Sequence, residues 1–77
     1  MIDLPELPEL PFALDKIAFA FASQTVDDEW RVAVIGHLFS DCAGRLSIVQ
    51  SSLPEAQARH MAAHINRVAA AARALLR

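Results

Sequence analysis

The sequence predicts an all-α protein, built from a short N-terminal helix and a long antiparallel helical hairpin that pairs with a second chain as a homodimeric helical bundle. Three observations lead to this prediction. Apolar residues recur at helical spacing along most of the chain. Two stretches carry the capping residues that are typical of a helix N-terminus. No segment alternates with period two for long enough to indicate a strand.

Residues 1–11 are expected to form an extended, proline-rich arm that leads into a single helical domain over residues 12–77. The segment LPELPELP, residues 4–11, places Pro5, Pro8 and Pro11 three residues apart. Each proline fixes its own φ angle and disfavours helix in the residue before it. The spacing therefore suits a polyproline II conformation.

The first helix is predicted over residues 12–22, FALDKIAFAFA, where Pro11 suits the first turn. Its large apolar side chains point nearly all round the predicted axis. A helix that is apolar on every side is buried on every side. In so short a chain, this requires a second chain or a position between other helices.

Two longer helices are predicted over about residues 27–50 and 54–76. Thr25 with Asp28 three residues later resembles a capping box, and Ser52 with Glu55 repeats the device with Pro54 in the first turn. Helices joined by so short a connection must lie antiparallel.

The middle helix is predicted to have two unlike faces. Gly36, Ser40 and Gly44 follow one another at intervals of four, and small residues at this spacing admit a second helix at short range. The alternative is that Gly44 kinks or ends the helix. Whether the ridge packs within the chain or between chains stays open. The opposite, bulky face is a predicted core stripe of Val34, Ile35, Leu38, Phe39, Cys42, Leu46 and Val49.

Composition indicates a protein that binds other proteins. Of the 77 residues, 55% are hydrophobic and 21% are charged, which is more apolar material than a small monomer buries easily. We therefore expect a homodimer that also docks on another protein as an adaptor, inhibitor or regulator. The predicted interface comprises the aromatic residues and the small-residue ridge, namely Phe12, Phe19, Phe21, Trp30, Gly36, Ser40 and Gly44.

Enzymatic activity, a cofactor and a small-molecule substrate are not expected. No glycine-rich phosphate loop or serine elbow occurs. Cys42 falls on the predicted bulky face, where a thiol is inert. A metal-binding bundle is one alternative function, because His60 and His64 share a helix face at i, i+4 and Asp41 lies level with them in the predicted hairpin. Boundary histidines and a solvated aspartate are the preferred interpretation.

Charge is unevenly distributed and suggests a second alternative. Residues 1–30 carry seven acids and one lysine, and residues 31–77 carry six arginines and two acids, within a formal net charge of −2. Arg59, Arg73 and Arg77 form a stripe on the last predicted helix that could contact the phosphates of a nucleic acid. A solvated helix face is the simpler interpretation, and nucleic acid is not the expected partner.

The sequence also predicts a cytoplasmic protein without a membrane partner. It has a single cysteine, which fits a reducing compartment. No uncharged apolar run approaches the roughly 20 residues that are needed to cross a bilayer.

Overall fold

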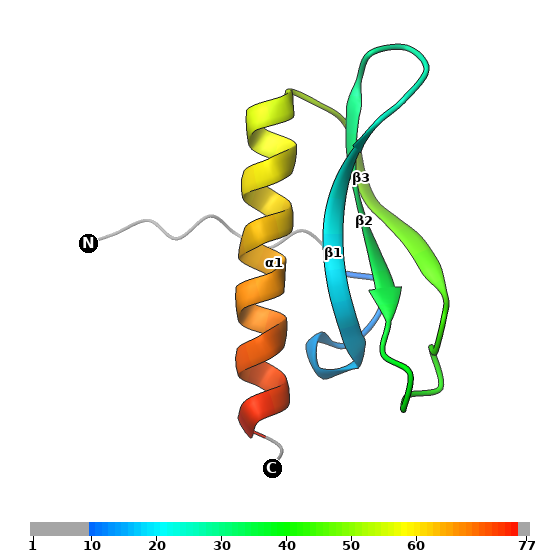
Figure 1. Cartoon of the computed structure of the whole chain (residues 1–77), viewed down its shortest axis with the longest axis vertical. Helices are drawn as coiled ribbons and strands as arrows, with labels where there is room; N and C mark the ends of the chain where they lie inside the picture. The colour runs from blue at the N-terminus through cyan, green and yellow to red at the C-terminus, as the bar shows by residue number, and fades with distance from the viewer. Residues whose placement is uncertain (1–9, 76–77) are drawn as a thin grey trace, which may run out of the picture.

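A three-stranded antiparallel sheet with one long helix on one side forms the protein (Figure 1). The computed structural model describes residues 10–75. A short 3₁₀ turn, η1 (Leu14–Lys16), leads into strand β1 (Ile17–Gln24), followed by β2 (Trp30–Gly36), β3 (Leu46–Leu53) and helix α1 (Glu55–Leu75). The strands lie in the order β1-β2-β3, so β1 and β3 form the two edges. Most of the predicted arm, residues 1–9, lies outside the described residues.

The prediction of an all-α helical bundle is wrong. Strands β1, β2 and β3 occupy the ranges 12–22 and 27–50 that were predicted to be helical, and only the last predicted helix has a counterpart, in α1. Large and small residues do alternate in β1, where Phe19 and Phe21 interleave with alanines. Alternation in size rather than in polarity escapes a search for polar and apolar residues. In β2, Val32, Val34 and Ile35 are β-branched residues that favour strands.

The predicted capping box at Thr25 is instead a hairpin turn between β1 and β2. The Thr25 N–H donates to the Glu29 carbonyl at 2.7 Å, and the Asp28 N–H donates to the Thr25 carbonyl at 3.2 Å. Asp28 has a φ of 60°, the left-handed conformation that closes three-residue hairpin loops. Aspartate tolerates that conformation and is common in turns, which is why the same residues suit a turn as well as a helix cap.

The hydrophobic core lies between α1 and one face of the sheet. The helix contributes Ala58, Ala62, Ile65 and Ala69 at helical spacing, which form a narrow and mostly small apolar stripe. The sheet contributes Ile17, Ala20, Val32 and Val34, all from β1 and β2. The helix accordingly packs across β1 and β2, and β3 lies farthest from it along most of its length (Figure 1).

Polar side chains of α1 also fasten the helix to the outer edge of β1. The Ala20 N–H donates to Asn66 Oδ1 at 2.6 Å, and Asn66 Nδ2 donates to the Ala20 carbonyl at 2.9 Å. Arg73 donates to the Ile17 carbonyl farther along the same edge. The Asn66 amide thus satisfies both backbone groups of Ala20, as the peptide of a neighbouring strand would.

The glycines do not form the predicted helical ridge. Gly36 ends β2, and a Cβ placed there would lie 1.9 Å from the carbonyl oxygen of Cys42. Gly36 therefore does admit a close approach, but of the loop backbone rather than of a helix. Gly44 lies in the same loop with a φ of +73° and open space around it. Glycine is therefore needed at position 44 for its left-handed φ and not for lack of space.

Substitutions should separate these two roles. We expect Gly36→Ala to lower the free energy of unfolding by about 1–3 kcal/mol, because the methyl group overlaps loop backbone. Gly44→Ala should cost about 1–2 kcal/mol through its left-handed φ alone. Gly44→Asn should recover much of that loss, since asparagine tolerates this conformation, whereas Gly36→Asn should recover nothing. Urea denaturation followed by circular dichroism measures all four values, and equal behaviour of the two asparagine variants would contradict this division.

Candidate functional site

The sheet face that points away from α1 is apolar across all three strands. The strand register brings Phe19, Ile35 and Leu46 into one cross-strand row. It brings Phe21, Ala33 and Ile48 into the next row. Residues on either side of these positions in the chain, such as Ala20, Val34 and Val49, pack in the core beneath α1. Since side chains alternate between the faces of a sheet, the two rows lie on the opposite face, which we call the open face.

Side chains of the open face cover one another only in part. Ala33 is 1% exposed although it is not part of the core packed by α1, so its flanking neighbours Phe21 and Ile48 shield it. The rings of Phe19 and Phe21 lie with their centroids 6.0 Å apart. Phe19, Leu46 and Ile48 remain 47%, 56% and 42% exposed. Antiparallel sheets with one solvated face usually carry polar residues there, whereas this face is apolar and has no covering layer among residues 10–75.

The loop between β2 and β3, residues 37–45, carries two more exposed apolar side chains at the end of the sheet. Leu38 and Phe39 are 78% and 92% exposed. The loop begins after Gly36 and ends before Leu46, so it lies at the end of the sheet that holds the row of Phe19, Ile35 and Leu46. Together these residues extend the apolar surface beyond the end of the sheet.

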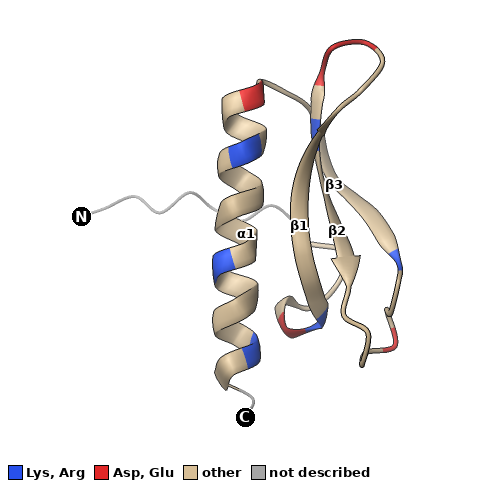
Figure 2. Ribbon diagram, viewed as in Figure 1, with Lys and Arg blue, Asp and Glu red and all other residues tan. Residues whose placement is uncertain are grey.

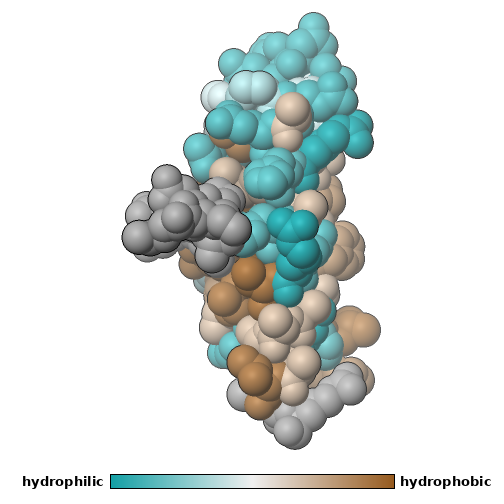
Figure 3. Space-filling view, turned by 90° about the vertical axis from the view of Figure 1, so that its left-hand side faces the viewer, coloured by the Kyte–Doolittle hydropathy of each residue, from teal (hydrophilic) through white to brown (hydrophobic). Residues whose placement is uncertain are grey.

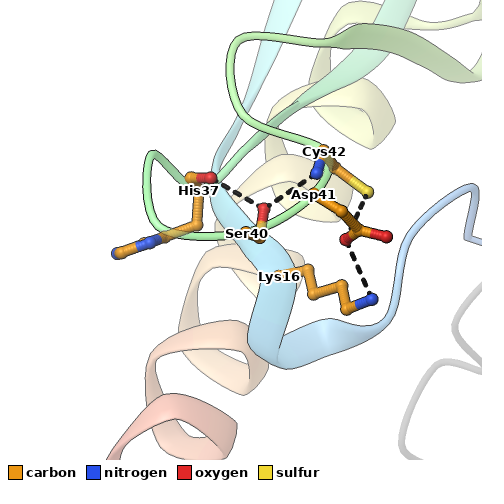
Figure 4. Close-up of polar contacts among 5 residues, drawn as sticks. All are labelled: Lys16, His37, Ser40, Asp41 and Cys42. Atoms are coloured by element: carbon orange, nitrogen blue, oxygen red, sulfur yellow. Dashed lines mark hydrogen bonds and ion pairs between the residues drawn. The ribbon is translucent and has the colours of Figure 1, made fainter.

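Polar contacts brace this loop from within (Figure 4). Ser40 Oγ donates to the His37 carbonyl at 2.7 Å and accepts the Cys42 N–H at 3.2 Å. The Phe39 N–H donates to His37 Nδ1 at 3.1 Å, while the His37 ring points away from the other four residues drawn. These hydrogen bonds consequently fix the backbone that carries Phe39.

An ion pair ties the loop to the start of β1. Lys16 Nζ lies 3.0 Å from Asp41 Oδ1, and the Cys42 thiol donates to the same oxygen at 3.6 Å. The hydrogen bond and charge of Asp41 raise the pKa of Lys16, and those of Lys16 lower the pKa of Asp41. The pair is solvent-exposed, so it fixes the position of the loop more than it stabilises the fold.

The predicted interface residues lie in three different places. Phe19 and Phe21 are on the open face. Phe12 and Trp30 pack against the core beneath α1, and the Arg59 guanidinium lies 5.1 Å from the centroid of the Trp30 ring. Gly36 is the last residue of β2, and Ser40 and Gly44 lie in the β2–β3 loop that follows it.

The candidate metal ligands do not converge. His60 and His64 lie on α1, while Asp41 lies in the β2–β3 loop, where its carboxylate contacts Lys16. The antiparallel hairpin that would have brought Asp41 level with His64 does not exist. Over residues 10–75 no group of three or more His, Cys, Asp and Glu side chains is arranged to hold a metal ion.

The arginines of the predicted basic stripe are partly engaged within the chain. Arg59 Nη2 lies 3.2 Å from Glu55 Oε1, and Arg73 donates to the Ile17 carbonyl. Arg77 lies outside the described residues. Figure 2 shows the cations spread along α1 rather than gathered, and acids at the β1–β2 turn, at the start of α1, before β1 and in the β2–β3 loop.

Leu46 and Ile48 are the open-face residues that sequence reasoning missed as binding residues. Leu46 was assigned to a helical core stripe together with Ile35, and Ile48 was assigned to no site. The signal that could have identified a strand is the run Leu46-Ser47-Ile48, which alternates apolar and polar residues just after Gly44. The run is short, because the next residue, Val49, is apolar and belongs to the core side.

The helix side of the molecule has a different character. Figure 3 shows hydrophilic residues gathered toward one end and apolar residues toward the other, without one continuous apolar surface. No helix among residues 10–75 is both long and apolar enough to cross a membrane.

Over the described residues, fold and site together define a small α/β domain with its helix on one side of the sheet and a partly exposed apolar face on the other. Comparison of the chain with protein-family models, with curated proteins and with solved structures gives no match. The candidate site therefore rests on the geometry of the open face and of the loop beside it.

The Lys16–Asp41 pair predicts a pH dependence. Because the pKa of Asp41 is lower in the folded chain than in the unfolded chain, its stabilising effect is complete above the ordinary carboxyl pKa and is lost as the pH falls through the folded value. Asp41→Asn should thus lower the melting temperature slightly at neutral pH, with a difference that closes in acid. Asp27→Asn, in the exposed β1–β2 turn, is the control. A gap between Asp41→Asn and the unsubstituted protein that widens in acid would contradict the assignment.

Proposed function

We propose that this chain is a small non-enzymatic protein-interaction module that acts as a homodimer and docks on another protein through its open face. The supporting observation is the partial exposure of Phe19, Leu46 and Ile48 on a sheet face that no element of the described part of the chain covers. An apolar sheet face is normally buried against a second layer, either a sheet or helices. A partner protein that supplies this layer would complete a sandwich.

The loop beside the open face favours a protein surface as the partner. Leu38 and Phe39 project as exposed apolar residues from an ordered loop, and large apolar side chains of this kind act as anchors in protein interfaces. Lys16, Asp41 and Arg45 supply charges near the same end of the sheet, as in a polar interface rim.

Catalysis is not part of this proposal. Catalytic groups with shifted pKa values usually lie in clefts, whereas the shifted pair of Lys16 and Asp41 is exposed at the surface. A single cysteine in the chain suits a reducing compartment, and we place the module in the cytoplasm as part of the same proposal.

The open face can be tested with a double variant. We expect an affinity-tagged Leu46→Thr/Ile48→Thr chain to lose the protein partner that the unsubstituted chain captures from its source cell, because two apolar contacts disappear. Threonine keeps the preference for strand, so the melting curve should change little. Quantitative mass spectrometry of the captured proteins, with and without nuclease, provides the measurement.

Val26→Thr is the matched control, because Val26 is 100% exposed on the β1–β2 turn, away from the open face. It should capture the same partner as the unsubstituted chain. Recovery of that partner by the double variant would contradict docking through the open face. Loss of the captured material on nuclease treatment would instead favour the arginines of α1 and a nucleic acid.

A further inference from the structure

The two edges of the sheet are not equivalent. On the outer edge of β1, the amide of Asn66 satisfies both backbone groups of Ala20, and Arg73 satisfies the Ile17 carbonyl. A further strand could pair there only by displacing these side chains of α1. Exposed sheet edges are commonly protected from such pairing, and here the helix supplies the protection.

Among the described residues, no side chain of α1 bonds to the edge formed by β3, although two bulges interrupt its pairing with β2. None of the eight residues of β3 is buried. Within residues 10–75, no side chain forms a hydrogen bond with the backbone of this strand. The strand contains no charged residue and no proline. The pairing with β2 is regular over Leu46, Ser47 and Ile48 and shifts at two points after them, so this first part of the edge, without charge or proline, is the template for strand addition.

The register shows which backbone groups are free. The backbone N–H and carbonyl of Ala20 point away from β2. Those of Val34, which lies opposite Ala20, therefore point toward β3. Ser47 lies opposite Val34 and bonds to β2, and the backbone groups of the next residue, Ile48, must point outward. The register is regular between the pairs Val34–Ser47 and Ala33–Ile48, so the N–H of Ile48 lies on the free edge.

The charges at the two ends of this edge have opposite signs. Arg45 precedes the strand. At its other end, Ser52 Oγ donates to Glu29 Oε2 at 2.9 Å and so holds that carboxylate beside the end of β3. Figure 2 shows the acids of the neighbouring β1–β2 turn at this end of the sheet. An antiparallel copy of β3 would place its own Arg45 near this carboxylate, whereas a parallel copy would place like charges together.

We propose that β3 pairs antiparallel with β3 of a second copy of this chain, which joins the two sheets into one sheet of six strands. A two-fold axis perpendicular to the sheet relates the copies, so each Arg45 lies near Glu29 of the other chain. Both helices then lie on one side, and the two open faces merge on the other side. The inference specifies the dimer of the proposed function, but it rests on the edge and not on the open face.

Two substitutions at one residue distinguish pairing through the edge from association through the open face. Ile48→Pro removes the outward N–H of the free edge, while Ile48→Thr keeps it and removes only the apolar side chain. Sedimentation velocity over a range of micromolar concentrations should show twice the chain mass of 8.4 kDa for the unsubstituted protein and for Ile48→Thr. Ile48→Pro should sediment as a monomer while circular dichroism shows a cooperative melt.

Charge reversal provides a second measurement, which also decides the matter if Ile48→Pro fails to fold. Arg45→Glu should weaken the dimer about tenfold, because two symmetry-related charge pairs become repulsive. Glu29→Arg should weaken it similarly, and Arg45→Glu/Glu29→Arg should restore the dissociation constant.

Four results would overturn the proposal. They are a monomeric unsubstituted chain, a folded Ile48→Pro chain that remains dimeric, an Ile48→Thr chain that becomes monomeric, and charge reversals without mutual rescue. A monomeric chain that captures its partner through the open face would leave the proposed docking intact while removing the dimer. A dimer that captures nothing through that face would do the reverse.

Discussion

The packing of a single helix on one side of a three-stranded sheet is the constraint on which the rest of this structure depends. The buried stripe of α1 is narrow and contains three alanines with Ile65, so it can lie close to β1 and β2. It covers β3 only through the partly buried Val49 and Leu53, and no residue of β3 is fully buried. Because the one helix lies on one side, the described part of the chain supplies no layer for the opposite side of the sheet, which is the open face.

The same constraint explains how the polar groups are used. Where α1 passes beside β1, Asn66 satisfies both backbone groups of Ala20 and Arg73 satisfies the Ile17 carbonyl. Where the helix does not reach, at the β2–β3 loop, the chain uses local contacts instead, with Ser40 and the Lys16–Asp41 pair holding the backbone (Figure 4). Part-buried polar groups beside the helix thus bond to its side chains, and those of the loop bond within the loop or to Lys16.

Sequence reasoning predicted the C-terminal helix because its signals are local. Ser52, Pro54 and Glu55 mark a helix start, and the alanine-rich stretch after them has high helix propensity. The strands were missed because their evidence is non-local. The alanines of β1 favour a helix in isolation, and only pairing with β2 makes the alternation of phenylalanine and alanine decisive. Residues of the turn at Thr25 suit a cap and a hairpin equally.

The candidate site was predictable only in part for the same reason. Phe19 and Phe21 could be singled out, since a surplus of aromatic residues needs a surface to contact. Leu46 and Ile48 could not, because apolar residues in this segment fit a helical stripe as well as a strand face. At Gly36 the sequence predicts the close approach of a helix, whereas the backbone that lies against it is that of Cys42, which depends on how the loop returns to the sheet.

The protection of β1 by Asn66 has a consequence for how many copies can associate. With one edge blocked, strand pairing closes after two chains, and the assembly has a fixed size. The block belongs to the helix, so a chain in which α1 detaches would expose both edges and become bivalent. Chains with two free edges polymerise without an end point. A dimer would then give way to a sheet that grows continuously by edge-to-edge pairing. The docking of one asparagine thereby sets the boundary between finite association and fibre growth.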